Sequence, residues 1–124
     1  MEKIEAGNVA FWFESREVGR DGGPTIRVHA SVDGNDVELL RFDCFRDRPH
    51  YHYHPSGENV QWRIDPTLVP DSLGWTLARL REDLDTMIVR AGYPGIASAL
   101  DSSAVANAAD KVADYFGVGV PSSP

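Results

Sequence analysis

The sequence has one cysteine, no long apolar run and no excess of basic charge, and each absence excludes a class of protein. The single cysteine, Cys44, cannot form an intramolecular disulfide or supply the paired thiolates of cysteine-based zinc motifs. No stretch approaches the roughly 18 apolar residues that a membrane helix needs. Residues 1–15 also lack the apolar run of a signal peptide. We therefore expect a cytoplasmic protein with no membrane association.

The charge balance argues against binding to nucleic acid through charge alone. Acidic residues outnumber lysine and arginine by 19 to 12, which gives a formal net charge of −7. Such a surface repels DNA, RNA and anionic lipid, so no general DNA binding is expected. Residues 41–63 depart from this balance, because they hold four arginines and only three acidic side chains. That region can still bind one small anion or one phosphodiester.

Alternating apolar and polar residues in the first half of the chain predict a sheet. Residues 25–32 show the clearest period of two, with apolar side chains on one face and polar side chains on the other. Asp33-Gly34-Asn35 favours a hairpin turn, whereas residues 16–24 end in DGGP and are predicted to form a polar loop. The predicted strands lie at residues 8–15, 25–32, 36–45, 50–54 and 59–65.

After residue 70 the apolar period lengthens to that of a helix. Leucines and other apolar residues recur at steps of three and four over residues 71–91, with Asp71 as the N-cap. An alanine-rich helix is predicted at residues 103–116, ended by Gly117. Strands followed by helices indicate an α+β fold. We expect an antiparallel sheet of four or five strands followed by two C-terminal helices packed on one face.

The helices cover only one face of the predicted sheet, so the other face is solvated or covered by a partner. Trp12, Tyr51 and Tyr53 are the candidates for an exposed aromatic patch on that face. Such a patch is compatible with a homodimer. The expected domain organisation is one α+β domain over residues 1–117 and a flexible C-terminal tail over residues 118–124.

Residues 41–54, with the sequence RFDCFRDRPHYHYH, hold three of the four histidines of the chain. In an extended strand, His50, His52 and His54 share one side and the intervening tyrosines share the other. Neighbouring imidazoles are then close enough for two of them to bind one ion of zinc, iron or manganese. The three histidines are thus candidate ligands of a divalent transition metal. A further ligand must come from elsewhere, such as His29, Asp43 or Asp47.

Three interpretations of this segment remain open. In the first, histidines act as general acid and base in a metal-free phosphodiester site, where an arginine stabilises the developing charge. In the second, they bind a metal, either structurally or for hydrolysis. In the third, the segment is an ordinary half-exposed strand. The candidate catalytic residues are His50, His52, His54, Arg41, Asp43, Arg46 and Arg48. Arg41 and Asp43 are also predicted to form an ion pair along one strand face.

The order of the motifs carries a family resemblance. Arg41-Phe42-Asp43 is followed by a proline, a histidine-rich stretch, the strand at residues 60–64 and the helix from Asp71. Over about residues 25–90, this order resembles the TumE-type bacterial toxin family and related small bacterial proteins. The resemblance implies an RNA-directed nuclease or hydrolase that acts with an antitoxin-like protein partner.

Two functions therefore stay open at the level of sequence. One is a small hydrolytic or nuclease-like protein whose histidines transfer protons. The other is a non-enzymatic binding or assembly module that holds a metal through His-x-His. Clustering of Arg41, Asp43 and the histidines around one concavity would favour the enzyme. Histidines spread along a convex face, or buried against a symmetry mate, would favour the module.

Overall fold

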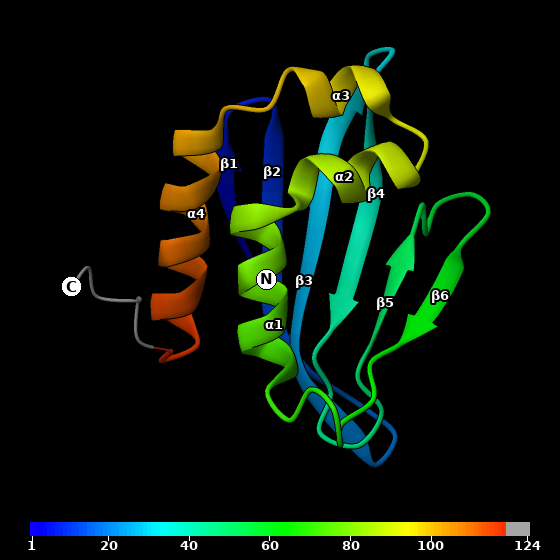
Figure 1. Cartoon of the computed structure of the whole chain (residues 1–124), viewed down its shortest axis with the longest axis vertical. Coiled ribbons are helices and arrows are strands. Elements are labelled where there is room, and N and C mark those ends of the chain that lie inside the picture. The colour runs from blue at the N-terminus through cyan, green and yellow to red at the C-terminus, as the bar shows by residue number, and fades with distance from the viewer. Residues whose placement is uncertain (119–124) are drawn as a thin grey trace.

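A six-stranded antiparallel sheet forms one layer of the molecule and helices form the other (Figure 1). The computed structural model describes residues 1–118. Each strand pairs with the next along the chain, so the sheet is a simple meander. The strands are β1 (Glu2–Ala6), β2 (Val9–Val18), β3 (Asp21–Val32), β4 (Asn35–Asp43), β5 (His50–Tyr53) and β6 (Val60–Arg63). The helices are α1 (Ser72–Glu82), α2 (Leu84–Arg90), α3 (Pro94–Ser98) and α4 (Ser102–Tyr115).

The α+β class and the antiparallel sheet agree with the sequence, but the sheet has six strands rather than four or five. The additional strand is β1, whose sequence EKIEA carries three charged residues and pairs with β2 at the edge of the sheet. Charged side chains are typical of edge strands, and they obscure the alternation by which a strand is recognised. A short edge strand is therefore hard to detect from sequence.

The loop predicted at residues 16–24 is wrong, because β2 and β3 continue through it and turn at Gly19 and Arg20. Gly19 adopts a positive φ of 63°, which suits glycine in a tight turn. Gly23 lies inside β3, where a Cβ would stand 2.4 Å from the carbonyl oxygen of Cys44. Glycine at this position therefore allows the backbone at Cys44, just after β4, to pass close to β3, and it does not interrupt the strand.

The single helix predicted over residues 71–91 is interrupted at Asp83. Asp71 does cap the first helix, since its carboxylate accepts a hydrogen bond from the backbone N–H of Gly74 at 2.9 Å. Asp83 leaves helical geometry with a φ of −128°, so α1 ends and α2 begins with Leu84. The interruption turns α2 away from α1 so that it lies across the upper end of the sheet (Figure 1). Four helices rather than two thus follow the strands in the described residues, with α4 within one residue of the predicted helix over 103–116.

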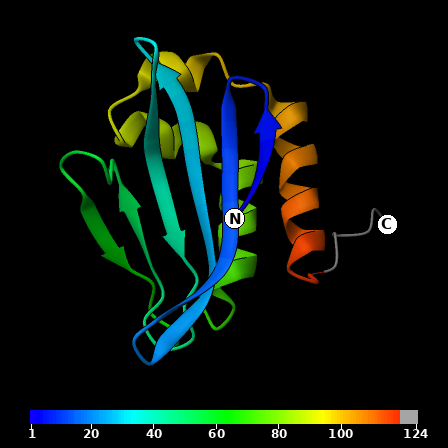
Figure 2. The same cartoon turned by 180° about the vertical axis from the view of Figure 1, so that it is seen from behind.

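The core lies between the helices and one face of the sheet, and the other face is open (Figures 1 and 2). Alternate residues of the central strands, including Phe11, Ile26, Val28 and Phe42, are fully buried against the helices. Burial of such side chains contributes roughly 1.5–3 kcal/mol each, which makes this face the main source of stability. The core residues contributed by the helices are Leu77, Leu80, Leu84, Met87, Ile88, Val105, Ala108, Ala109 and Val112.

Tyr51 and Tyr53 lie on the helix-facing side of the sheet, so their predicted place in an exposed patch on the open face is wrong. Tyr51 packs beside Trp75 of α1, with ring centroids 5.3 Å apart. Of the predicted tail, Val118 packs against the core and its N–H donates to the carbonyl of Ala113, while residues 119–124 lie outside the described residues. No helix among the described residues combines the length and the apolarity required to cross a membrane.

Candidate functional site

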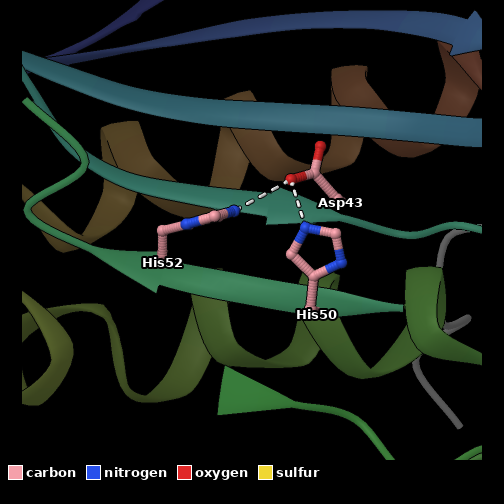
Figure 3. A group of neighbouring side chains, drawn as sticks. All are labelled: Asp43, His50 and His52. Atoms are coloured by element: carbon pink, nitrogen blue, oxygen red, sulfur yellow. Dashed lines mark ion pairs between the residues drawn. The ribbon is translucent and has the colours of Figure 1, made fainter. Parts of the chain in front are cut away.

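The end of β4 and the adjoining strand β5 bring one carboxylate and two imidazoles together on the open face of the sheet (Figure 3). Asp43 is paired in register with His50, and His52 follows two positions along β5, so the three side chains share one face. The Oδ2 atom of Asp43 lies 3.0 Å from Nε2 of His50 and 3.3 Å from Nε2 of His52. The ligand atoms of all three residues lie within 4.8 Å of one another.

The second nitrogen of each imidazole is held by an oxygen acceptor. The Nδ1 atom of His50 lies 2.8 Å from the carbonyl oxygen of Arg48, and Nδ1 of His52 lies 2.7 Å from Oδ1 of Asn59. Because both partners are acceptors, each Nδ1 carries the proton and donates it. A neutral ring in that tautomer has its lone pair on Nε2. In that neutral form, the lone pair of each ring points toward Asp43.

The two oxygens of Asp43 have different surroundings. Oδ1 accepts hydrogen bonds from the hydroxyl of Thr25 at 3.0 Å and from the guanidinium of Arg16 at 2.8 Å. Arg16 also donates from Nε to the same hydroxyl at 3.0 Å. Arg16 and Thr25 together therefore hold the Oδ1 side of the carboxylate, opposite the histidines. Oδ2 is buried and receives no hydrogen bond of good geometry within residues 1–118. The carboxylate thus leaves one oxygen for the histidines.

The site is charged and almost closed to water. Asp43 is 1% exposed and His52 is 7% exposed. Burial alone would raise the pKa of the Asp43 carboxyl, but pairing with His50 and Arg16 outweighs burial and holds the pKa well below its usual range. Pairing with Asp43 in turn raises the pKa of His50 above its ordinary value, against the opposing effect of burial. Asp43 is therefore an anion at neutral pH, with Arg16 as the positive partner of Oδ1 and with Oδ2 facing the two histidines.

Three acceptor atoms with no directed donor between them can be satisfied in two ways. One is a proton on Nε2 of His50, which would form an ion pair with Asp43. The other is a cation placed between the three atoms, since a carboxylate oxygen and two imidazole nitrogens are ordinary metal ligands. The hydrogen bonds at Nδ1 of both rings are the arrangement that metal-ligating histidines adopt in proteins.

A hollow of about 440 Å³ adjoins the ring of His50, between the β2–β3 turn and residues 45–50. The ring of Phe45 meets the ring of His50 edge to face, with centroids 5.6 Å apart. The guanidinium of Arg16 lies 5.5 Å from the centre of the Phe45 ring. Phe45 and Arg16 therefore cover Asp43, while one side of His50 stays accessible from the hollow.

His54 does not join the other two histidines, so the expectation that all three share one side is wrong. β5 ends at Tyr53, and His54 adopts a positive φ of 48°. That conformation turns the ring toward the helix layer, where Nδ1 is hydrogen-bonded to the hydroxyl of Tyr93. The rings of His54 and Tyr93 are stacked. His54 therefore anchors the β5–β6 turn to the segment between α2 and α3.

The three candidate arginines lie apart from the carboxylate, and the predicted pairing of Arg41 with Asp43 is wrong. Arg41 donates to Glu38 at 2.6 Å, because the irregularity between the pairs Val28–Leu40 and His29–Glu38 brings Glu38 onto the same face. Arg46 forms a double hydrogen bond with Glu17 in solvent. Arg48 is exposed, and its side chain lines the hollow beside His50.

Other residues singled out in the sequence lie outside the group as well. His29 is on the open face, where its Nδ1 lies 3.0 Å from Asp36, and Asp47 is exposed. Cys44 points into the core beside the hydroxyl of Thr76, and burial, partly offset by that contact, raises the pKa of its thiol to about 12.

Sequence reasoning missed the residues that orient the group, namely Arg16, Thr25 and Asn59. Thr25 stands opposite Asp43 in the β3–β4 register, and that register depends on the bulge between Val28 and His29. Asn59 reaches His52 because it adopts a positive φ of 52° after the β5–β6 turn. None of these three residues has a local sequence signal for its role, since Arg16 and Thr25 act across paired strands and Asn59 acts through the conformation of the turn.

Comparison with known proteins matches the chain to one family. The model of a family described as a domain of unknown function, DUF7700, matches residues 3–116. No curated protein and no solved structure matches the chain.

Proposed function

Because the chain belongs to the DUF7700 family, whose description assigns no function, we propose a function from the site alone. The protein binds one divalent transition-metal ion through Asp43, His50 and His52. The observation that carries this proposal is the convergence of three acceptors on one point. Both histidines donate from Nδ1 to other groups, and the Oδ2 atom of Asp43 is buried without a directed donor.

The donor set favours some ions over others. Two imidazole nitrogens and one carboxylate oxygen suit zinc, iron and manganese better than calcium or magnesium, which prefer all-oxygen sites. Three protein ligands leave further coordination positions for water or a substrate, as in catalytic rather than structural zinc sites. The hollow beside His50 provides access to those positions. The site is therefore suited to metal-assisted hydrolysis, in which the ion polarises the bond that is cleaved.

Elemental analysis of the freshly purified, untagged chain tests the proposal. We expect close to one equivalent of zinc, iron or manganese in the wild type, and its loss in His52→Ala. His29→Ala is the matched control, because His29 lies on the same face of the sheet but outside the group. A wild type that contains no metal and binds none when titrated with zinc, iron(II) or manganese(II) would overturn the proposal.

A second candidate function is metal-free cleavage of RNA by His50, as the TumE-like order of motifs implies. One observation favours it. Arg20 and Arg48 line the hollow beside His50, and neither forms an ion pair among residues 1–118. They would hold a phosphate while His50 transfers a proton. This function predicts RNA cleavage that persists in a chelator and falls by about 10²-fold or more in His50→Ala. Cleavage that requires added metal would instead favour the first proposal.

A further inference from the structure

The two edges of the sheet differ in how they are protected. β1 carries Glu2, Lys3 and Glu5 and packs against α4, and charged residues of this kind prevent edge strands from pairing with other chains. All four residues of β6 are exposed, and they include two large apolar side chains. Trp62 is 55% exposed and Val60 is 42% exposed. Within residues 1–118, β6 is thus a short edge strand with one charged side chain, Arg63, and with its large apolar side chains left exposed.

We propose that β6 pairs antiparallel with β6 of a second copy of the chain and forms a two-fold symmetric dimer. The backbone of β6 supplies the first argument. The N–H of Ile64 donates to the carbonyl of Pro49 at 2.9 Å, so Ile64 faces β5. Because inward and outward residues alternate along an antiparallel strand, Trp62 and Val60 also bond to β5. The N–H and C=O groups of Gln61 and Arg63 therefore point outward, where no strand of the same chain meets them.

A two-fold axis at Trp62 satisfies all of these outward groups. Gln61 of one copy then faces Arg63 of the other, and each pair exchanges two backbone hydrogen bonds. An axis at Gln61 would satisfy only the groups of Gln61 itself. The register centred on Trp62 is therefore the favoured one, and it produces a continuous sheet across both copies.

The side chains of β6 are complementary to themselves in this register. Trp62 stands opposite Trp62 of the second copy in a pair without hydrogen bonds, where side chains approach most closely. Val60 faces Ile64, and Arg63 faces the neutral Gln61, so no like charges oppose each other. A hollow of about 450 Å³ lined by Tyr51, Tyr53 and Arg90 opens beside Trp62 on the helix side. It offers aromatic surface to the tryptophan of the second copy.

Sedimentation equilibrium of the full chain over a range of concentrations tests the dimer. The proposed interface consists of one short strand from each copy, so it buries less surface than a standard interface of about 1,600 Å². We therefore expect a dimer that dissociates on dilution. Gln61→Pro removes one outward N–H without breaking the pairing with β5, and it should weaken the dimer by about tenfold or more. Gln61→Thr keeps the N–H and is the matched control. Circular dichroism and thermal melting establish that both variants are folded.

Either of two results would overturn the proposal. A wild type that stays monomeric at about 0.5 mM would exclude pairing of β6 with a second copy of the chain. A strand of another protein would then be the remaining partner for β6. A dimer unchanged in folded Gln61→Pro would place the interface elsewhere.

Disulfide trapping tests the register and does not depend on the proline variant. In the proposed register, Trp62→Cys places two thiols across a pair whose Cα atoms are about 4.5 Å apart, within disulfide range. Gln61→Cys places them about 8 Å apart or more, which is too far. Cys44 is buried and contributes no background. We expect covalent dimers from Trp62→Cys under mild oxidation, and covalent dimers from Gln61→Cys alone would overturn the register.

Discussion

At the scale of single residues, the site depends on side chains that touch no ion. His52 has its Nε2 atom directed at Asp43 because the amide oxygen of Asn59 accepts a hydrogen bond from Nδ1–H at 2.7 Å. Losing such a supporting hydrogen bond typically lowers metal affinity by about 10–100-fold. We predict a loss of that size in Asn59→Ala, measured by competition with a chromogenic chelator. Asn8→Ala is the control, since Asn8 also makes one side-chain hydrogen bond, to Ile96, far from the site. Equal affinity in both variants would show that Asn59 does not orient the ring.

The only cysteine gives a second test at this scale. Cys44 is 5% exposed, and burial raises the pKa of its thiol to about 12, against an ordinary value of 9.0. The reactive species of a thiol is the thiolate, which is scarce at neutral pH under these conditions. We predict no reaction with Ellman's reagent in the folded protein at pH 8, and one equivalent of reaction after unfolding in guanidinium. Fast reaction of the folded protein would mean that the end of β4 opens readily.

The candidate site could be predicted in part from single residues. The spacing of His50 and His52 predicts that their side chains share a face, and Asp43 is one of the three further ligands that the sequence offers, with His29 and Asp47. The conformation of His54 could not be predicted, because its positive φ arises from the turn and its contact with Tyr93 comes from a distant helix connection. The partners of Arg41 and Asp43 follow from the strand register, which local alternation does not specify.

At the scale of elements, the strands that alternate strongly can be predicted, including the edge strand β6, whereas the charged edge strand β1 and the extension of β2 and β3 through residues 16–24 cannot. The sequence predicts one helix over 71–91 because Leu84, Met87 and Ile88 continue the apolar stripe of α1. The stripe specifies which residues are buried but not the direction of the axis. Packing of α2 over the sheet requires the interruption at Asp83, and that requirement is tertiary.

The close approach of Gly23 in β3 to Cys44, just after β4, makes this backbone contact sensitive to substitution. Gly23 has a φ of 147° and lies so close to Cys44 that an added Cβ would meet its carbonyl oxygen at 2.4 Å. We predict that Gly23→Ala lowers the free energy of unfolding by about 2 kcal/mol or more, because the backbone of either strand must shift. Urea denaturation measures the change.

Gly95→Ala is the matched control for that substitution. Gly95 lies in α3, and a Cβ there meets no atom within 4 Å. Alanine also has the higher helix propensity, so this variant should be neutral or gain up to about 1 kcal/mol. Equal destabilisation in the two variants would contradict the close approach at Gly23.

At the scale of the whole molecule, the two faces of the sheet differ in composition and in role. The helix-facing side holds the apolar core, and the open face holds paired charges, among them Arg27 with Glu14 and Glu38. The acidic residues of that face are largely neutralised by neighbouring arginines, which is why a chain with a net charge of −7 can carry a locally balanced surface. The sequence gives the charge total, whereas the pairing appears only when the strands are in register.

The proposed metal should link β4 to β5 and therefore stabilise the entire fold. Asp43 comes from β4, while both histidines come from β5, which is the inner strand of the hairpin at one end of the sheet. An ion that binds only the folded chain adds about 2.7 kcal/mol to the free energy of unfolding at 100 times its dissociation constant. For a chain of this size, we predict that the melting temperature rises by about 8–15 °C on addition of metal and returns to its starting value in a chelator.

The variants decide whether that rise belongs to the group. His29→Ala should retain the shift, since its imidazole lies outside the three ligands, and His52→Ala should lose it at the same metal concentration. Differential scanning fluorimetry with zinc, manganese and magnesium in parallel shows whether the stabilising site prefers ions that bind imidazole, because magnesium binds an imidazole-rich site weakly. A shift of equal size in His52→Ala would mean that the ion binds at exposed carboxylates instead. The stabilisation would then have no connection to the convergence of Asp43, His50 and His52.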